Sequence, residues 1–169
     1  MQIKPSTSRL GQVWRLTPRW GLLGALATAF LATPSVSKAK YASIVIDAKT
    51  GKVWHSINAN TRNFPASLTK VMTLYLLFEA IDQKKLTFDS QLKVSRRAAS
   101  QPASKLGLKP GQTIKVRDAA AALIVRSAND VATTVAEALA GNERRFALRM
   151  TQKARQVGMS RTTFRNASG

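Results

Sequence analysis

The sequence FPASLTK at residues 64–70, together with the apolar segment that follows it, constrains the fold of this chain more than any other feature. From Leu68 to Ile81 the residues after Lys70 are apolar on nearly every helical face, which predicts a helix surrounded by protein. Pro65 favours a helix that begins directly after it. A serine and a lysine therefore stand at the buried end of a core helix, where a purely structural helix has no use for either side chain.

The Ser-x-x-Lys pattern is weak by itself, since the chain contains it four times, as the pairs Ser35–Lys38, Ser37–Lys40, Ser67–Lys70 and Ser90–Lys93. The first two serines lie in the N-terminal segment, and the last pair leads into a short predicted strand, where residues three apart point to opposite faces. Only Ser67 and Lys70 share a helix face, with Cβ atoms about 5–6 Å apart. Burial would lower the pKa of Lys70, as a general base requires, and the helix N-terminus could stabilise an oxyanion. The alternative is that Ser67 only caps the helix and Lys70 reaches solvent.

A second polar element, Ser127-Ala-Asn129, lies in a tight connection between two alanine-rich segments. A serine hydroxyl can relay a proton, and an asparagine amide can bind a peptide carbonyl and hold a lysine in place. The alternative is a helix–helix turn with capping residues. Ser-x-Asn also occurs at residues 56–58, but that copy belongs to the end of a predicted hairpin.

The remaining pattern predicts a mixed chain with one hairpin and several helices. Strands are predicted at 41–47 and 52–57 around a turn at 48–51, and short strand-like pieces at 91–94 and 113–116 in an otherwise irregular region, 85–116. Helices are predicted at 117–126, 131–140 and 143–157. Asp130 and Asn142 are expected as N-caps, and Gly141 and Gly158 as helix ends.

The composition excludes several kinds of site. The chain has no cysteine and a single histidine, which excludes disulfides and thiolate metal sites and argues against zinc. A Ser-His-Asp triad would need His55, which we expect on the surface of a predicted strand.

The N-terminal segment predicts export. Residues 1–39 hold five basic and no acidic residues, then a short apolar run and small residues, which is typical of a secretory signal peptide cleaved after Ala39. An uncleaved anchor is the alternative. The net charge is +19, and without residues 1–39 the 22 basic and 8 acidic residues leave +14. Such a surface attracts an anionic membrane or cell-wall polymer. No basic patch with interleaved aromatics is visible, so we expect no nucleic-acid partner.

From Tyr41 to its last residue the chain resembles the D-alanyl-D-alanine carboxypeptidases, the low-molecular-mass penicillin-binding proteins of peptidase family S11. The resemblance is carried by the segments YASIVIDAKTGKV, FPASLTKVMTLYLLFEA, SKLGLKPGQTIKV, SANDVATTVAEALAG and MTQKARQVGMSRTTFRNASG. It implies an α/β (α+β) fold of the serine β-lactamase and penicillin-binding-protein-like transpeptidase type. Here we expect its N-terminal β-hairpin and helical subdomain, in an incomplete catalytic domain at 40–169.

The resemblance also implies roles for four residues. Ser67 is the acyl-ester nucleophile that attacks between the two terminal D-alanines of a peptidoglycan pentapeptide, and Lys70 accepts its proton. Ser127 relays a proton toward the leaving D-alanine, and Asn129 orients the substrate amide. The resemblance implies acylation by β-lactam antibiotics and no metal or organic cofactor. From the predicted signal peptide we expect export to the periplasm, where the protein can associate with the inner membrane.

One sequence motif of the family does not occur at its expected position in this chain. Family members carry Lys-Thr-Gly on a strand after the Ser-x-Asn loop, whereas the only copy here, Lys49-Thr-Gly51, lies in the hairpin turn before Ser67. We therefore expect the C-terminal sheet strands to be missing, and residues 40–169 alone to be inactive or nearly so and poorly stable, with an unpaired sheet edge.

Two other functions stay open at this point. One is a non-catalytic periplasmic module that binds cell-wall polymer. The other is a class A-like β-lactamase, which needs a deacylating glutamate after the Ser-x-Asn element. Only Glu137 and Glu143 follow it, and both lie in predicted helices.

Overall fold

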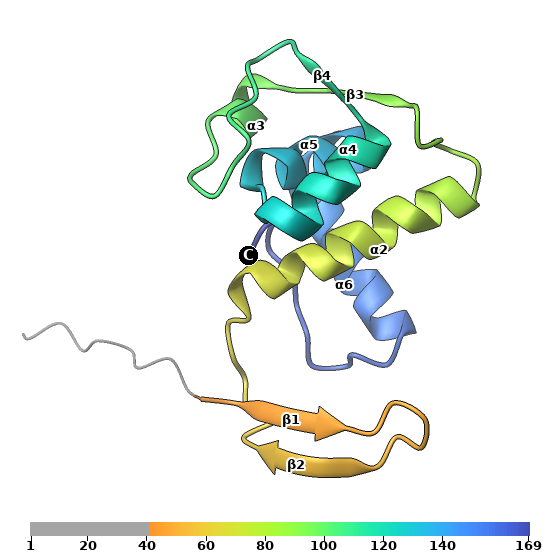
Figure 1. Cartoon of the computed structure of the whole chain (residues 1–169), viewed down its shortest axis with the longest axis vertical. Coiled ribbons are helices and arrows are strands. Elements are labelled where there is room, and N and C mark those ends of the chain that lie inside the picture. The colour runs from red at the N-terminus through yellow and green to blue at the C-terminus, as the bar shows by residue number, and fades with distance from the viewer. Residues whose placement is uncertain (1–40) are drawn as a thin grey trace, which may run out of the picture. The chain divides into compact units, whose positions relative to one another are not determined.

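The computed structural model describes residues 41–169, which form a β-hairpin followed by a group of packed helices and a second small sheet (Figure 1). The predicted signal peptide and its cleavage site at 1–39 lie outside the described residues, so they stay predictions. In the described part of the chain, no helix is both long enough and apolar enough to cross a membrane.

The predicted hairpin is confirmed. Strands β1 (Ser43–Ile46) and β2 (Val53–Ile57) pair antiparallel, with an irregularity in the register after Val45. The carboxylate of Asp47 organises the turn, because it accepts hydrogen bonds from the backbone N–H of Lys49 and from both the N–H and the hydroxyl of Thr50. The bonds from Thr50 hold the pKa of Asp47 below its ordinary value.

The hairpin buries almost none of its apolar side chains. The exposed residues include Ile44, Val45, Ile46, Val53, Trp54 and Ile57. His55 is exposed on β2, as expected from the sequence. Since successive residues of a strand point to opposite faces, both faces of this two-stranded sheet are apolar and open.

The apolar segment forms helix α2 (Thr69–Asp82), preceded by a short 3₁₀ turn, η2 (Ala66–Leu68). One side of α2 is buried, including Met72, Thr73, Leu76, Leu77 and Ala80. The other side exposes Val71, Tyr75 and Phe78, and Leu68 of η2 is exposed as well. The prediction that protein surrounds this helix is therefore right for one side only.

The region predicted as irregular contains more structure than the sequence indicated. Strands β3 (Gln91–Lys93) and β4 (Thr113–Lys115) pair antiparallel, close to the predicted positions. The one-turn helix α3 (Arg96–Ala99) was not predicted. Ser95 caps it by accepting a hydrogen bond from the N–H of Ala98.

The helices that follow lie close to their predicted ranges. They are α4 (Val116–Ala121), the π-helical turn η3 (Ala122–Arg126), α5 (Asn129–Ala140) and α6 (Glu143–Gln156). Asn142 caps α6 as predicted, since its side chain accepts from the N–H of Arg145. Gly141 ends α5 with φ of 77°, a left-handed conformation that glycine adopts without strain.

The prediction that Asp130 caps α5 is wrong. Asp130 lies inside the first turn of the helix and is fully buried. Its carboxylate instead accepts backbone N–H groups of Leu106, Gly107 and Leu108, which fixes the loop that crosses this helix end. A local capping pattern cannot reveal partners that lie more than 20 residues away.

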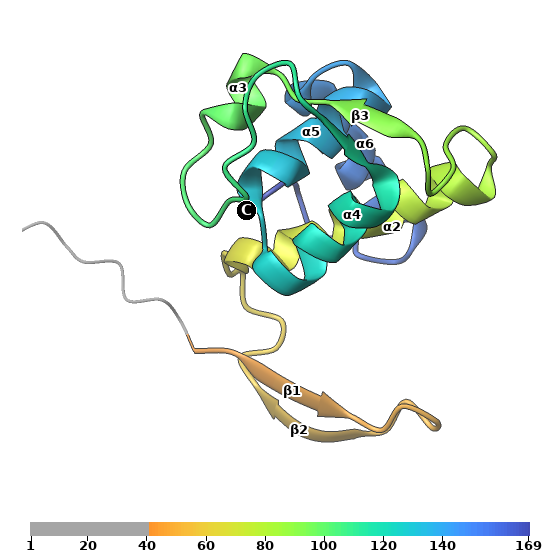
Figure 2. The same ribbon diagram turned by 45° about the horizontal axis from the view of Figure 1, so that its top comes forward.

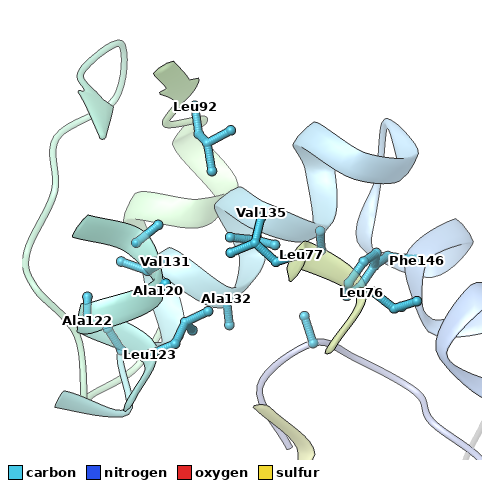
Figure 3. Packing of buried hydrophobic residues seen from close by; sticks show 14 of the residues in the cluster. Leu76, Leu77, Leu92, Ala120, Ala122, Leu123, Val131, Ala132, Val135 and Phe146 are labelled. Atoms are coloured by element: carbon cyan, nitrogen blue, oxygen red, sulfur yellow. The ribbon is translucent and has the colours of Figure 1, made fainter. Parts of the chain in front are cut away.

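The core lies around α5, which packs against α2, α3, α6 and β3 (Figure 2). Figure 3 shows Val131, Ala132 and Val135 of α5 among side chains from α2, η3 and α6, with Leu92 of β3 at the edge. Phe146 of α6 is fully buried. This packing buries one side of α2, the helix that holds Lys70 in its first turn and directly follows Ser67.

Candidate active site

Ser67 and Lys70 lie as the helical spacing predicts, although Ser67 belongs to the 3₁₀ turn and not to α2 itself. The Nζ of Lys70 donates to the Oγ of Ser67 at 3.3 Å. Ser67 is exposed, whereas Lys70 is only 3% exposed. The capping interpretation is wrong, since neither η2 nor α2 has a side-chain cap, and Lys70 does not reach solvent.

Burial gives Lys70 the property that a base needs. Removing the amine from water disfavours its charged form, so burial lowers the pKa of Lys70 from its ordinary value. In its neutral form, which burial favours, the amine can accept a proton from the neighbouring hydroxyl.

Lys70 has a second partner that sequence reasoning missed. Its Nζ also donates to the backbone carbonyl of Ser168, at 2.9 Å, from the opposite end of the described chain. Figures 1 and 2 both show the C-terminal end beside the start of α2. No local sequence pattern could predict this contact, because it joins two residues that are 98 positions apart.

The start of α2 lines a groove of about 440 Å³ that also receives Ser127 from the connection after η3. Its polar side chains are those of Ser67, Lys70 and Ser127, and its apolar lining is Pro65, Leu68, Val71, Leu74, Leu123 and Ile124. The structure thus brings three of the four predicted site residues to one groove.

Two non-glycine residues, one lining this groove and one next to a lining residue, adopt left-handed backbone conformations. Ala66, directly before Ser67, has φ of 47°, and Ser127 has φ of 54°. Such conformations cost on the order of 1–3 kcal/mol and persist only where the surrounding structure enforces them. The backbone is therefore strained at the two places where it presents a serine to the groove.

Asn129 has a different environment. Its side-chain nitrogen donates to the carbonyls of Pro102 and Ala103, at 3.1 and 3.3 Å, and its backbone N–H donates to Ser104. Asn129 does not line the groove. In this structure its amide fixes the 102–104 loop beside Ser127, and its role toward a substrate stays a prediction.

The arrangement can perform acyl transfer, because an accessible hydroxyl stands beside a buried amine at a helix start. Backbone N–H groups at that end favour negative charge, as on an oxyanion. Among residues 41–169, no three His, Asp or Glu side chains gather closely enough to hold a metal ion.

Comparison with known proteins shows the family of this chain. A model of the Peptidase S11 family, described as D-alanyl-D-alanine carboxypeptidase, matches residues 29–169. The chain is 35% identical to the carboxypeptidase DacF of Bacillus subtilis over 127 residues, 75% of this chain and 33% of that protein. It is 32% identical to DacC of Escherichia coli over 84% of this chain and 38% of that protein. The chain thus spans 33% and 38% of the length of these two relatives.

Solved structures show the same fold. The carboxypeptidase DacD from Francisella tularensis matches with a TM-score of 0.74 and 35% identity, over 78% of this chain and 32% of that chain. Penicillin-binding protein D2 from Listeria monocytogenes, in its cefotaxime-bound form, matches with a TM-score of 0.67 and 35% identity, over 76% of this chain and 51% of that one. The described residues therefore have part of the penicillin-binding-protein fold, and the chain belongs to the D-alanyl-D-alanine carboxypeptidase family, Peptidase S11.

Proposed function

We propose that this chain carries the nucleophile and the base of a serine-type D-Ala-D-Ala carboxypeptidase that trims peptidoglycan stem peptides. The observation that carries the proposal is the pairing of an exposed Ser67 hydroxyl with a Lys70 amine that is 3% exposed and 3.3 Å away. Family membership supplies the substrate class.

The reaction begins when the Oγ of Ser67 attacks the carbonyl carbon between the two terminal D-alanines and Lys70 takes the hydroxyl proton. The tetrahedral intermediate collapses as the C–N bond breaks, and the amine of the leaving D-alanine receives a proton through Ser127. Water then hydrolyses the ester, which releases the shortened peptide and restores Ser67.

The same serine is the proposed site of β-lactam acylation. Penicillin-binding protein D2 has been solved in cefotaxime-bound and ampicillin-bound forms, and it matches this chain over the part that contains Ser67 and Lys70 with 35% and 34% identity. Attack of Ser67 on the lactam carbonyl would form an ester and break the ring C–N bond, and the protonated amine would stay attached to the acyl group instead of departing as D-alanine does.

Residues 41–169 alone are expected to react slowly. The groove is open, and the β1–β2 hairpin exposes its apolar side chains. The relatives named above are two to three times as long as the matched segment. We propose that the complete site needs further sheet strands, and that the protein works in the periplasm, where the substrate lies.

A β-lactamase function is disfavoured by the position of Glu143. Its carboxylate is held by Arg97 at 2.5 Å and by the N–H of Ala167 at 3.2 Å, so it is not placed to activate water. The wall-binding alternative rests on the basic charge of the chain and predicts binding to peptidoglycan that survives Ser67→Ala.

The test is a graft. In the Francisella tularensis carboxypeptidase, the segment that this chain matches is replaced by the corresponding residues of this chain, and release of D-alanine from a peptide ending in D-Ala-D-Ala is measured. We expect release by the graft and its loss in Ser67→Ala. Ser90→Ala is the matched control, since Ser90 belongs to another Ser-x-x-Lys pair and its hydroxyl accepts the N–H of Thr87. Equal release by the parent and Ser67→Ala grafts would refute the assignment.

A further inference from the structure

The segment Asn166–Gly169 forms a turn, here called the Lys70 turn, that lies against the start of α2. The side-chain oxygen of Asn166 accepts the backbone N–H groups of Ser168 and Gly169, at 3.1 and 2.6 Å. This folds the segment so that the Ser168 carbonyl receives the hydrogen bond from Lys70.

The turn also packs tightly against the residue before the nucleophile. A Cβ on Gly169 would lie 2.0 Å from the carbonyl oxygen of Ala66, and Gly169 has φ of 98°. Only glycine fits at this approach. The Lys70 turn therefore touches both the base and the backbone that presents Ser67.

Both backbone groups of Ala167 are anchored by side chains. The Oγ1 of Thr73 donates to the Ala167 carbonyl at 2.7 Å, and the carboxylate of Glu143 accepts the Ala167 N–H at 3.2 Å. Thr73 and Ala167 are fully buried, so these bonds are made in a dry environment. Thr73 lies one helical turn after Lys70 on α2.

Glu143 is itself held in place. Its side chain is 7% exposed and pairs with Arg97, whose side chain is 64% exposed. Arg97 belongs to α3 and Glu143 to the start of α6, so the pair ties two helices to the Lys70 turn. A buried carboxylate with one ion-pair partner and one backbone partner has little freedom to move.

We propose that Thr73 and Glu143 are positioning residues for Lys70. By anchoring Ala167 from both sides, they fix the Ser168 carbonyl as the second acceptor of the Lys70 amine and keep water away from it. Their contribution to catalysis rests on the proposed function, because it acts through Lys70 as the base. Misplacing a catalytic group by about 1 Å can cost on the order of a hundredfold in rate.

The test measures Lys70 itself in the full 169-residue chain. Competitive trace acetylation of all lysines, read by peptide mass spectrometry from neutral pH to above 10.5, gives the apparent pKa of each amine. In the parent chain, Lys70 should titrate below its ordinary pKa of 10.5. The exposed amine of Lys115 serves as an internal reference.

Two matched pairs of variants test whether Thr73 and Glu143 position Lys70. Thr73→Val keeps the volume but removes the hydroxyl, and Thr73→Ser keeps the hydroxyl. Glu143→Ala removes the acceptor of the Ala167 N–H, and Glu143→Gln keeps one. We expect the Lys70 pKa to rise toward 10.5 in Thr73→Val and Glu143→Ala, because the loosened turn admits water, and to match the parent in Thr73→Ser and Glu143→Gln.

An unchanged Lys70 pKa in a folded Thr73→Val chain would overturn the proposal, as would an equal shift in Thr73→Ser. If Glu143→Ala fails to fold, the Thr73 pair still decides, since Thr73→Val preserves the packing. The readout does not need turnover. If the Lys70 pKa shifts in Thr73→Val and the graft is inactive, the proposed function is refuted and the positioning role stands. If the graft is active and the Lys70 pKa does not shift in Thr73→Val, the proposed function stands and the positioning role is refuted.

Discussion

The helices and the β1–β2 hairpin use similar apolar residues with opposite results. In the helical part, Leu77, Val135 and Phe146 are fully buried around α5. In the hairpin, Ile44, Val45 and Trp54 are 50%, 48% and 68% exposed. The hairpin is held by its backbone pairing and by the Asp47 turn, and the helices are held by side-chain packing.

This difference bears on function, because the groove with Ser67, Lys70 and Ser127 is formed by the packed helices and their connections, here called the packed part, and not by the hairpin. Lys70 and Thr73 face the buried side of α2, whereas Val71 and Tyr75 of the same helix face outward. Lys70, the proposed base, thus lies on the packed side of α2. An isolated two-stranded hairpin is marginally stable in water, so we expect the hairpin to add little to the stability of residues 41–169.

The largest effect is expected from a matched pair of aromatic deletions. Phe146→Ala should lower the free energy of unfolding by about 3–5 kcal/mol, because it opens a cavity in the core. Trp54→Ala should change it by less than about 0.5 kcal/mol, since that side chain is 68% exposed. Urea unfolding of the chain measures both. Comparable losses in the two variants would show that the hairpin packs as well as the helices do.

A smaller loss in the free energy of unfolding is expected for Asp130→Asn, because the buried Asp130 carboxylate holds the 106–108 loop by hydrogen bonds. Asp130→Asn replaces one oxygen by an NH₂ group that faces the N–H groups of Gly107 and Leu108, so donors would oppose donors. The cost should be about 2–3 kcal/mol in the free energy of unfolding. Asp118→Asn, at an exposed position of α4, is the control and should change it by less than about 0.5 kcal/mol. If the two variants unfold alike, the carboxylate does not hold the 106–108 loop.

The smallest effect concerns the buried charge of Lys70. Because burial lowers its pKa in the folded state, the unfolded chain binds more protons between the folded pKa and 10.5. Stability carried by this group therefore rises as the pH rises through that window, and below it the buried charge is a cost. Relative to Lys70→Met, the parent should become more stable as the pH approaches 10.5. A difference between the two that does not vary with pH would contradict a lowered pKa.

Patterns local in sequence predicted most of the secondary structure. The hairpin, the cap at Asn142, the end at Gly141 and the ranges of α5 and α6 all depend on residues within a few positions of each other, and each is confirmed. The short helix α3 was missed because four residues carry no periodic signal.

Contacts between distant segments could not be predicted in this way. The contact of Ser67 with Lys70 follows from helical spacing, but the contact of Lys70 with Ser168 requires the whole helical part to be folded. The same holds for the buried partners of Asp130 and for the use of the Asn129 amide beside the 102–104 loop. Sequence reasoning predicted the contact of Ser67 with Lys70 and missed the contact of Lys70 with Ser168.

The measurement that tests the central claim most directly is peptide mapping after exposure of the grafted carboxypeptidase to a fluorescent penicillin. We predict one acylated peptide, containing Ser67, that disappears in Ser67→Ala and persists in Ser90→Ala. An adduct on another residue, or undiminished labelling of Ser67→Ala, would contradict the claim that Ser67 is the nucleophile.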